Sequence, residues 1–322
     1  MRPAQTPGTM VRSRIDSSHP VGASPRPAGA RLPEPLRGAA LMVGGGVLLG
    51  TVGLFVDEAG RPALEQVFVR CAIGCAALVA YAAAAGRLGE LRVDRRGLRV
   101  ALLSGALMVA NWALFFAALQ RTSIAVATLV FHVQPLWVMG WGMLFLGEPR
   151  SPRRMLAAAL ALLGLGLAVG PAVLARPQGA YLQGVGFALL ASLCYAAVTL
   201  IAKAQRRLSG FALATWQCGV GALCLAWWPW LHGLPREAAP WLWMTGLGLL
   251  PTAAAYVALY SCMPRLQAGQ IAVLQFVYPI TAILVDRAAF GHRLSPLQWL
   301  GVLAMGVALW AVGRARQAGR LG

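Results

Sequence analysis

Charged residues are scarce in this chain, and acidic residues are the scarcest. Only 12% of the 322 residues are charged, with 10 Asp and Glu against 28 Lys and Arg, while 58% are hydrophobic. Soluble globular domains carry about 25% charged residues. The composition therefore excludes an ordinary soluble fold and points to a chain that lies largely in a lipid bilayer.

Several familiar motifs are also missing. No Gly-Lys-Ser/Thr follows the glycine-rich stretch Gly44–Gly46, so close helix packing explains these glycines better than a phosphate-binding loop. No apolar block of about 7–15 residues precedes the first long one, which excludes a signal peptide. Residues 1–37, rich in Pro, Arg, Ser, Gly and Ala, are expected to form a disordered cytoplasmic tail. All six cysteines lie in apolar segments, which favours packing over disulfides.

What the chain does contain is a series of ten apolar blocks. Each is about 20 residues long, the length that a helix needs to cross a hydrocarbon core of ~30 Å. The sequence therefore predicts an all-α integral membrane protein with ten transmembrane helices joined by short loops. The blocks lie at 38–56, 66–86, 98–119, 123–146, 155–174, 182–202, 211–231, 241–262, 268–290 and 296–313.

The second half of the chain repeats the first at a shift of 144 residues, without a gap. Pro135 then falls on Pro279 and Gly147 falls on Gly291. Each half holds five predicted spans, and an odd number makes the second copy enter the membrane from the opposite side. We therefore expect two inverted repeats of five helices each. Their predicted bounds are 38–174 and 182–313, followed by a cytoplasmic tail at 314–322.

Positive charge is spread unevenly over the loops. With the N-terminus placed inside, cytoplasmic segments hold 21 of the 28 Lys and Arg, outer loops hold six, and Arg70 lies within a span. This positive-inside pattern predicts two cytoplasmic termini in a multi-pass protein of a bacterial-type inner membrane. The charge forms no stripe or known binding module, so we expect no nucleic-acid partner despite a net charge of +18.

The fourth span carries a resemblance to a known family. From Thr122 to Pro152 the chain reads TSIAVATLVFHVQPLWVMGWGMLFLGEPRSP. Its small residues, internal proline, Leu-Gly-Glu exit and Ser-Pro start to the next helix resemble the EamA-type domain of the drug/metabolite transporter superfamily. The segment from Gln270 to Pro296 resembles the same module. The resemblance implies two EamA repeats, ten helices and a central cavity lined mainly by helices 1, 3, 4, 6, 8 and 9.

One position departs from this resemblance. Where the first copy has Glu148, the second has His292, so the exit motif cannot serve the same chemistry in both halves. The resemblance makes Glu148 a structural residue. Its basic neighbours at the membrane edge are Arg150, Arg153 and Arg154.

Polar residues flank the two matched prolines. A proline frees a carbonyl one turn earlier and kinks its helix, so Pro135 and Pro279 are predicted hinges. Polar side chains near the bilayer centre are costly unless they face a cavity or find partners. We expect these residues to line one midplane cavity that binds solute, with a histidine satisfied by a neighbouring helix as the alternative. They are His132, Gln134, Gln275 and Tyr278.

Further candidates for the cavity lie in spans 3, 6 and 8. An amide in hydrocarbon needs hydrogen-bond partners, which makes the asparagine the most informative of them. Trp and Tyr are equally common at membrane interfaces, so the aromatic residues are less specific. The candidates are Asn111, Trp112, Tyr195, Tyr256 and Tyr260.

Two charged residues fall within predicted spans. Arg70 lies about 7 Å from the outer end of span 2, at ~1.5 Å per residue, and Asp286 lies at a similar depth in span 9. We predict that they form an ion pair that opens during transport, because pairing lowers the desolvation cost of each charge. Snorkelling of Arg70 and pairing of Asp286 with Arg287 are the alternatives.

Together these features predict a secondary transporter, an exporter of a small metabolite or amphipathic solute. The chain has no ATP-binding motif, and Asp286 and His132 are the groups that a coupling proton can use. A uniporter driven by the gradient of its own solute fits equally well. An intramembrane enzyme such as a lipid or acyl transferase is an alternative, but the clustered acids, bases or nucleophiles that it needs are missing. A non-transporting sensor or scaffold is a further alternative. We expect no enzyme activity, cofactor or metal, and either a monomer or a homodimer.

Overall fold

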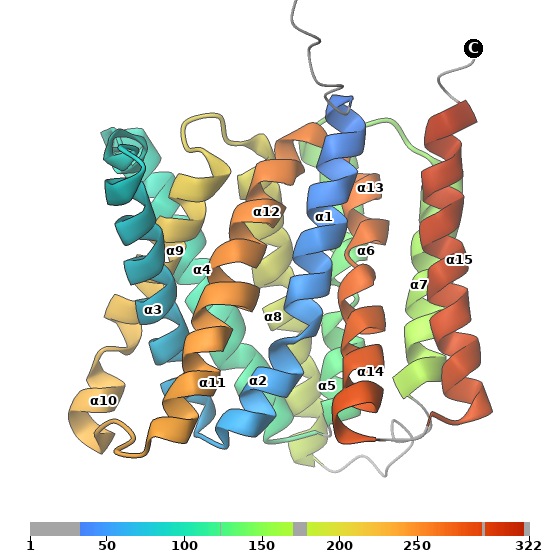
Figure 1. Ribbon diagram of the computed structural model, residues 1–322. Helices are drawn as coiled ribbons and strands as arrows, with labels where there is room; N and C mark the ends of the chain where they lie inside the picture. The colour runs from blue at the N-terminus through green and yellow to red at the C-terminus, as the bar shows by residue number, and fades with distance from the viewer. Residues whose placement is uncertain (1–32, 123, 170–178, 292–293, 319–322) are drawn as a thin grey trace, which may run out of the picture. The chain divides into compact units, whose positions relative to one another are not determined.

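The computed structural model describes residues 33–122, 124–169, 179–291 and 294–318. Within these residues the secondary structure is helical and contains no strand (Figure 1). The first helix begins at Glu34 and the last ends at Ala318, so both extend into segments that were predicted to be tails. The rest of the predicted tails, residues 1–32 and 319–322, lie outside the described residues.

The elements follow one another in two successive groups. The first half comprises α1 (Glu34–Gly50), α2 (Val52–Ala59), α3 (Ala63–Ala84), η1 (Leu88–Leu91), α4 (Arg95–Leu119), α5 (Ile124–Phe131), α6 (Gln134–Phe145) and α7 (Pro152–Val169). The second comprises α8 (Gly179–Ala204), α9 (Gly210–Leu225), α10 (Trp227–His232), α11 (Ala238–Gly248), the π-helical turn η3 (Leu249–Ala254), α12 (Ala255–Cys262), η4 (Met263–Arg265), α13 (Ala268–Leu274), α14 (Val277–Phe290) and α15 (Pro296–Ala318).

Among the described residues, eight helical segments are long and apolar enough to cross a membrane, which confirms the all-α membrane fold. Five of them join two or more of the elements named above, two shorten a single helix, and one, Ala63–Ala84, coincides with α3. α7 is not among the eight, and the apolar part of α15, Pro296–Val312, is shorter. The eight segments are Leu36–Ala59, Ala63–Ala84, Arg95–Ala118, Val126–Phe145, Ala180–Ala204, Gly210–His232, Ala238–Arg265 and Ala268–Phe290.

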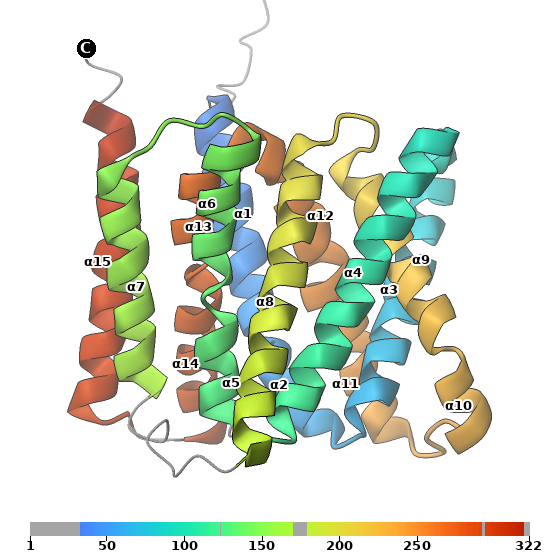
Figure 2. The same ribbon diagram turned by 180° about the vertical axis from the view of Figure 1, so that it is seen from behind.

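The helices run alternately between two ends of the bundle. Figures 1 and 2 show that α1 begins at the same end at which α15 finishes, whereas α8 begins at the opposite end. Several helices pack against their own counterparts at the 144-residue shift: α3 packs against α9, and α7 against α15. At the same shift α12 is the counterpart of the second half of α4, and α8 is the counterpart of α1. The contact of α4 with α8 is therefore equivalent to the contact of α12 with α1. Such pairs of equivalent contacts are expected when a twofold axis relates the two halves.

Small residues bring several of these helices into close contact, as expected where lipid offers no hydrophobic drive for association. Between α7 and α15, a Cβ on Gly164 would lie 2.7 Å from the carbonyl oxygen of Gly301. On α1, a Cβ on Gly46 would lie 3.0 Å from Val277, and one on Gly50 would lie 2.4 Å from Thr281. The glycine-rich start of the chain thus serves helix packing.

Two helices are interrupted just before their matched prolines. α5 ends at Phe131 and α6 begins at Gln134, while α13 ends at Leu274 and α14 begins at Val277. Pro135 and Pro279 have no N–H to donate to the carbonyl four residues earlier, which explains the position of both breaks. The backbone forms a turn at each break, and Figure 2 shows both breaks about halfway between the two ends of the bundle.

Candidate functional site

The two helix breaks bring residues from both halves together. The ring of His132, at the first break, stacks on the ring of Tyr278, with centroids 5.6 Å apart and planes 10° apart. The His132 ring also lies 6.3 Å from Phe276, its own counterpart at the 144-residue shift. Equivalent residues come this close only near the axis that relates the two halves, so the breaks lie where the halves meet.

His132 is buried and held in one orientation. Its Nδ1 lies 2.7 Å from the carbonyl oxygen of Thr128. A carbonyl only accepts hydrogen bonds, so Nδ1 carries a proton and Nε2 is left for a further partner. Phe131 packs edge-on against His132 at 5.7 Å and lies 5.9 Å from the ring of Tyr195.

Buried amide groups near the breaks lack hydrogen-bond partners among the described residues. The Nε2 of Gln134 has none, and neither Nε2 nor Oε1 of Gln275 has one. On α4, the Oδ1 of the buried Asn111 also has no partner among the described residues, and its Nδ2 has only the sulfur of Met108, at 3.8 Å. A buried amide without partners is costly, and a bound polar solute or water would satisfy these groups.

Arg70 forms a second polar cluster in the bundle interior. It is only 7% exposed. Its Nε donates to the Thr252 hydroxyl at 3.0 Å, and its Nη2 donates to the Tyr256 hydroxyl at 3.3 Å. The guanidinium lies over the ring of Trp112, 5.2 Å from the ring centre. Arg70 therefore points into the protein and does not snorkel to the surface.

Arg70 also lies deeper than the sequence indicated. α3 begins at Ala63, before the predicted start of the span. Seven residues at ~1.5 Å per residue place Arg70 about 10 Å from that end of the helix, where we expected about 7 Å. The predicted span began at residue 66 and left out the start of α3, because that start contains the charged but buried Glu65.

Thr252 is a site residue that the sequence analysis missed. It lies in the π-helical turn η3, next to Pro251. Pro251 cannot donate to the carbonyl of Leu247, and the Thr252 hydroxyl donates to that oxygen instead, at 2.7 Å. The same hydroxyl accepts from Arg70. A Pro-Thr pair in mid-span without a counterpart in the first half, which has Leu107 and Met108, was the available signal.

The remaining aromatic candidates extend the two clusters. Tyr256 stacks on Tyr260, with centroids 5.6 Å apart and planes 6° apart, and Tyr260 donates to the side-chain oxygen of Gln217. At the first helix break, the ring of Phe131 lies between His132 and Tyr195 in the series of ring contacts. The Arg70 cluster thus extends to Gln217, and the cluster at the helix breaks extends to Tyr195.

The structure does not bring Arg70 and Asp286 together. No salt bridge between described residues joins them. α14, which carries Asp286, packs against α1, α2 and α15, whereas α3 packs against α9, α11 and η3. The ion pair between Arg70 and Asp286 thus stays a prediction. It would form only in another conformation of the protein, in which α3 and α14 lie closer together.

A buried carboxylate that the sequence analysis missed lies near the same end of α3. Arg61 donates to both carboxylate oxygens of Glu65, at 3.0 and 3.1 Å. The hydrogen-bonded Glu65 raises the pKa of Arg61 above its ordinary value. The pair fixes the loop between α2 and α3 and satisfies a buried acid.

At the opposite end, Glu148 joins the two halves. Its Oε1 lies 2.9 Å from the Nζ of Lys203 on α8, and its Oε2 accepts from the backbone N–H of Ala268 at 2.6 Å. Lys203 in turn donates to the carbonyl of Leu266. We call Glu148, Lys203 and the first residue of α13, Ala268, the Glu148 bridge.

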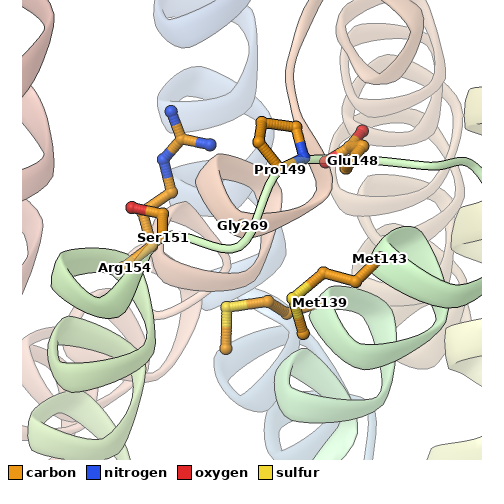
Figure 3. A pocket seen from close by; sticks show the side chains of 7 residues that line it. All are labelled: Met139, Met143, Glu148, Pro149, Ser151, Arg154 and Gly269. Carbon is orange, nitrogen blue, oxygen red and sulfur yellow. The ribbon is translucent and has the colours of Figure 1, made fainter.

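Figure 3 shows the surroundings of the Glu148 bridge. Glu148 and Pro149 follow α6, Arg154 stands at the start of α7, and Gly269 of α13 lies between them. The partner of Glu148 is Lys203 and not one of the arginines beside it in the sequence. His292, its counterpart in the second copy, lies outside the described residues.

Comparison with known proteins identifies the family. The model of the EamA-like transporter family matches residues 36–170 and 182–314, which together span most of the chain. The chain belongs to the EamA-like transporter family. The resemblance read from the fourth span and its copy is thereby confirmed, as is the two-repeat architecture.

Relatives of this EamA-family chain support the same assignment. An uncharacterized transporter of Archaeoglobus fulgidus is 30% identical over 266 residues, covering 82% of this chain and 92% of the relative. The uncharacterized transporter YxxF of Bacillus subtilis is 28% identical over 280 residues, covering 84% and 88%. A solved structure described only as a crystal structure of a protein has a TM-score of 0.75 at 20% identity, covering 87% of this chain and 96% of that one. The chain is a multi-pass membrane transporter for a small solute.

Proposed function

We propose that this EamA-family chain is a secondary transporter that exports a small metabolite or amphipathic solute by alternating access. The observation that carries the proposal is the meeting of two broken helices, one from each half, beside buried amides that bond no described residue. Broken helices in a transporter interior expose backbone and polar side chains to a solute. Rocking of the two halves about this region would open it to each side in turn.

The proposal includes the full topology. All ten helical segments cross the membrane in two inverted repeats, with α7 and α15 as a closely packed pair, and both termini are cytoplasmic. The shared end of α1 and α15 and the opposite start of α8 support this arrangement (Figures 1 and 2). The excess of Lys and Arg in the loops at that shared end supports its assignment to the cytoplasm of a bacterial-type cell.

Energy coupling through protons is a further part of the proposal. Asp286 lies half-buried on α14, and His132 keeps Nε2 available at the helix break. Both are groups whose charge a proton can change in a membrane interior. Pro135 and Pro279 act as the hinges on which the two broken helices bend.

Site accessibility tests the proposed cavity. In full-length protein without native cysteines, Gln134→Cys and Gln275→Cys should react with a small polar thiol reagent, and transported solute should protect them. Leu163→Cys and Leu303→Cys are matched controls, because both side chains are exposed on the outer helices α7 and α15. Reaction at positions 134 and 275 no faster than at the controls would remove the cavity.

Solute flux distinguishes the alternatives. Proteoliposomes with the full chain should show saturable, gradient-driven flux of at least one solute from a metabolite panel. An intramembrane enzyme, sensor or scaffold would show none. Reporter fusions at residues 175–181, of which 175–178 lie outside the described residues, should lie on the outer side of the membrane. A cytoplasmic location there would overturn the inverted topology.

A further inference from the structure

Arg70 carries a charge that no acidic side chain among the described residues balances. An arginine stays protonated in proteins, and Arg70 is the only buried Lys or Arg among the described residues. Its partners are the neutral hydroxyls of Thr252 and Tyr256 and the ring of Trp112. None of the salt bridges between described residues includes it.

Part of the guanidinium remains free to bind. Arg70 has five N–H donors, and its hydrogen bonds use Nε and one hydrogen of Nη2. Nη1 donates to no described residue. The edge formed by Nη1 and Nη2 is the fork that binds a carboxylate through two parallel hydrogen bonds.

We infer that Arg70 binds the carboxylate of the transported solute, which is a small organic monocarboxylate with an apolar, planar body. This inference rests on the proposed transport function. Thr252 and Tyr256 hold the guanidinium in place, and the carboxylate balances its charge once the solute is bound.

The number of charges selects the class of anion. One buried cation balances one negative charge, whereas a phosphate ester carries about 1.5 to 2 negative charges at neutral pH and calls for more cations. The ring of Trp112, which lies under the guanidinium, and the ring of Tyr256, whose hydroxyl accepts from Arg70, offer flat apolar surfaces next to the cation. A planar apolar body fits against such rings.

Carboxylates of the protein itself are less suitable partners. Glu65, the nearest acid along α3, is bound through both oxygens by Arg61. Asp286 lies on α14, whose main packing partners are α1, α2 and α15. The groups around Arg70, two hydroxyls and an aromatic ring, are all neutral. They hold the guanidinium without neutralising it, so that an exchangeable anion can bind there.

The test uses full-length protein in lipid nanodiscs and four matched pairs of solutes. Each pair is an acid and its neutral amide: benzoate and benzamide, phenylacetate and phenylacetamide, butyrate and butyramide, isovalerate and isovaleramide. Binding is measured by calorimetry, and flux is measured in proteoliposomes. At least one acid should bind, and its amide should bind about 30-fold more weakly or worse, as expected for loss of a buried charge pair.

Variants assign that preference to the arginine. Arg70→Gln should weaken acid binding about 30-fold or more and leave amide binding unchanged, while Arg121→Gln, an exposed arginine on the loop after α4, should change neither. Should Arg70→Gln fail to fold, Thr252→Val and Tyr256→Phe keep the charge and remove one hydroxyl each. Each should weaken acid binding about 3- to 10-fold without affecting the amide.

Each outcome decides the inference. Acid binding that depends on Arg70, without flux of any solute, supports the inference and removes the transport function. Flux of neutral or cationic solutes with no acid bound leaves transport in place and overturns the inference. Equal acid binding by the wild type and Arg70→Gln also overturns it. Rescue of a poor folded yield of Arg70→Gln by Asp286→Asn would make Asp286 the counter-ion and would overturn it as well.

Discussion

The third long helix of the first half and its counterpart in the second half differ by a single turn. α4 (Arg95–Leu119) is continuous, whereas the equivalent segment is interrupted by the π-helical turn Leu249–Ala254. Leu107 and Met108 in α4 correspond to Pro251 and Thr252. π-helical turns often mark functional sites, and this one supplies the hydroxyl that holds Arg70.

The comparison shows which features the two repeats share and which occur in only one of them. Both copies keep the proline, the helix break before it and the packing of counterpart helices. Arg70 corresponds to Ala214, Thr252 to Met108 and Tyr256 to Trp112, so the polar cluster exists only once. The shared features build a scaffold that can rock, and the differences between the copies supply an asymmetric site for one solute.

The largest expected effect on stability comes from the Glu148 bridge, which also lacks a copy because residue 292 is histidine. Glu148→Ala should lower the free energy of unfolding by about 2–4 kcal/mol. It leaves Lys203, only 12% exposed at its side chain, without its anion and exposes the N–H of Ala268. Thermal unfolding in detergent measures the loss.

A double variant controls for this effect. Adding Lys203→Met should recover part of the stability, because it removes the uncompensated charge. Strictly additive losses would mean that Glu148 and Lys203 do not interact energetically.

The role of the π-helical turn Leu249–Ala254 can be tested by giving it the residues of the first half. The Pro251→Leu, Thr252→Met variant should abolish transport and lower stability by about 1.5–3 kcal/mol, because Arg70 loses a charged hydrogen bond in the interior. Flux and thermal unfolding are the measurements.

The reverse change is the matched control. Leu107→Pro places a proline in the continuous helix α4 and should cost about 3 kcal/mol without creating a new site. Retained transport in the Pro251→Leu, Thr252→Met variant would show that the interrupted turn has no part in solute binding.

The pair His132 and Phe276 offers a smaller test at the twofold axis. His132→Phe keeps a ring against Tyr278 but loses the hydrogen bond to Thr128, which should cost about 1 kcal/mol. If His132 couples protons, the pH dependence of flux should disappear in this variant while flux itself persists. An unchanged pH profile would exclude His132 from coupling and leave Asp286 as the candidate.

The smallest expected effect is in the loop before α4, where Glu90 corresponds to Leu234. The hydrogen bond from Arg87, together with one from Ser209, holds the pKa of Glu90 below its ordinary value. The resulting stability is present above about pH 4.3, the ordinary value, and is lost as pH falls through the lowered one. Both side chains are more than a third exposed, so Glu90→Gln should cost under about 0.5 kcal/mol at neutral pH. A difference from wild type that grew in acid would contradict this assignment.

Composition and repetition were sufficient to predict an all-α membrane protein with two repeats, and the resemblance carried by Thr122–Pro152 and its copy indicated the family. Apolar blocks of membrane length predicted the helices, and the matched Pro135 and Pro279 marked both breaks, since proline acts on its own helix regardless of neighbours. Short-range chemistry of this kind can be read from sequence.

Partners across helices could not be read in the same way. The bonds from Arg70 to Thr252 and from Glu148 to Lys203 depend on which helices pack and in what rotation. Glu65 was missed because hydropathy excludes a charged first turn even where an arginine nearby satisfies it. The pairing of Arg70 with Asp286 was inferred from depth alone, and depth does not determine which helices are neighbours.

Flux by the Gln134→Leu, Gln275→Leu variant in proteoliposomes tests the central claim most directly. The claim is that the buried amides at the two helix breaks bind solute. Because these amides bond no described residue, leucines of similar size should leave thermal stability unchanged or raise it. The account predicts that saturable flux of the wild-type solute is lost in this stable variant. Unchanged saturable flux would contradict it.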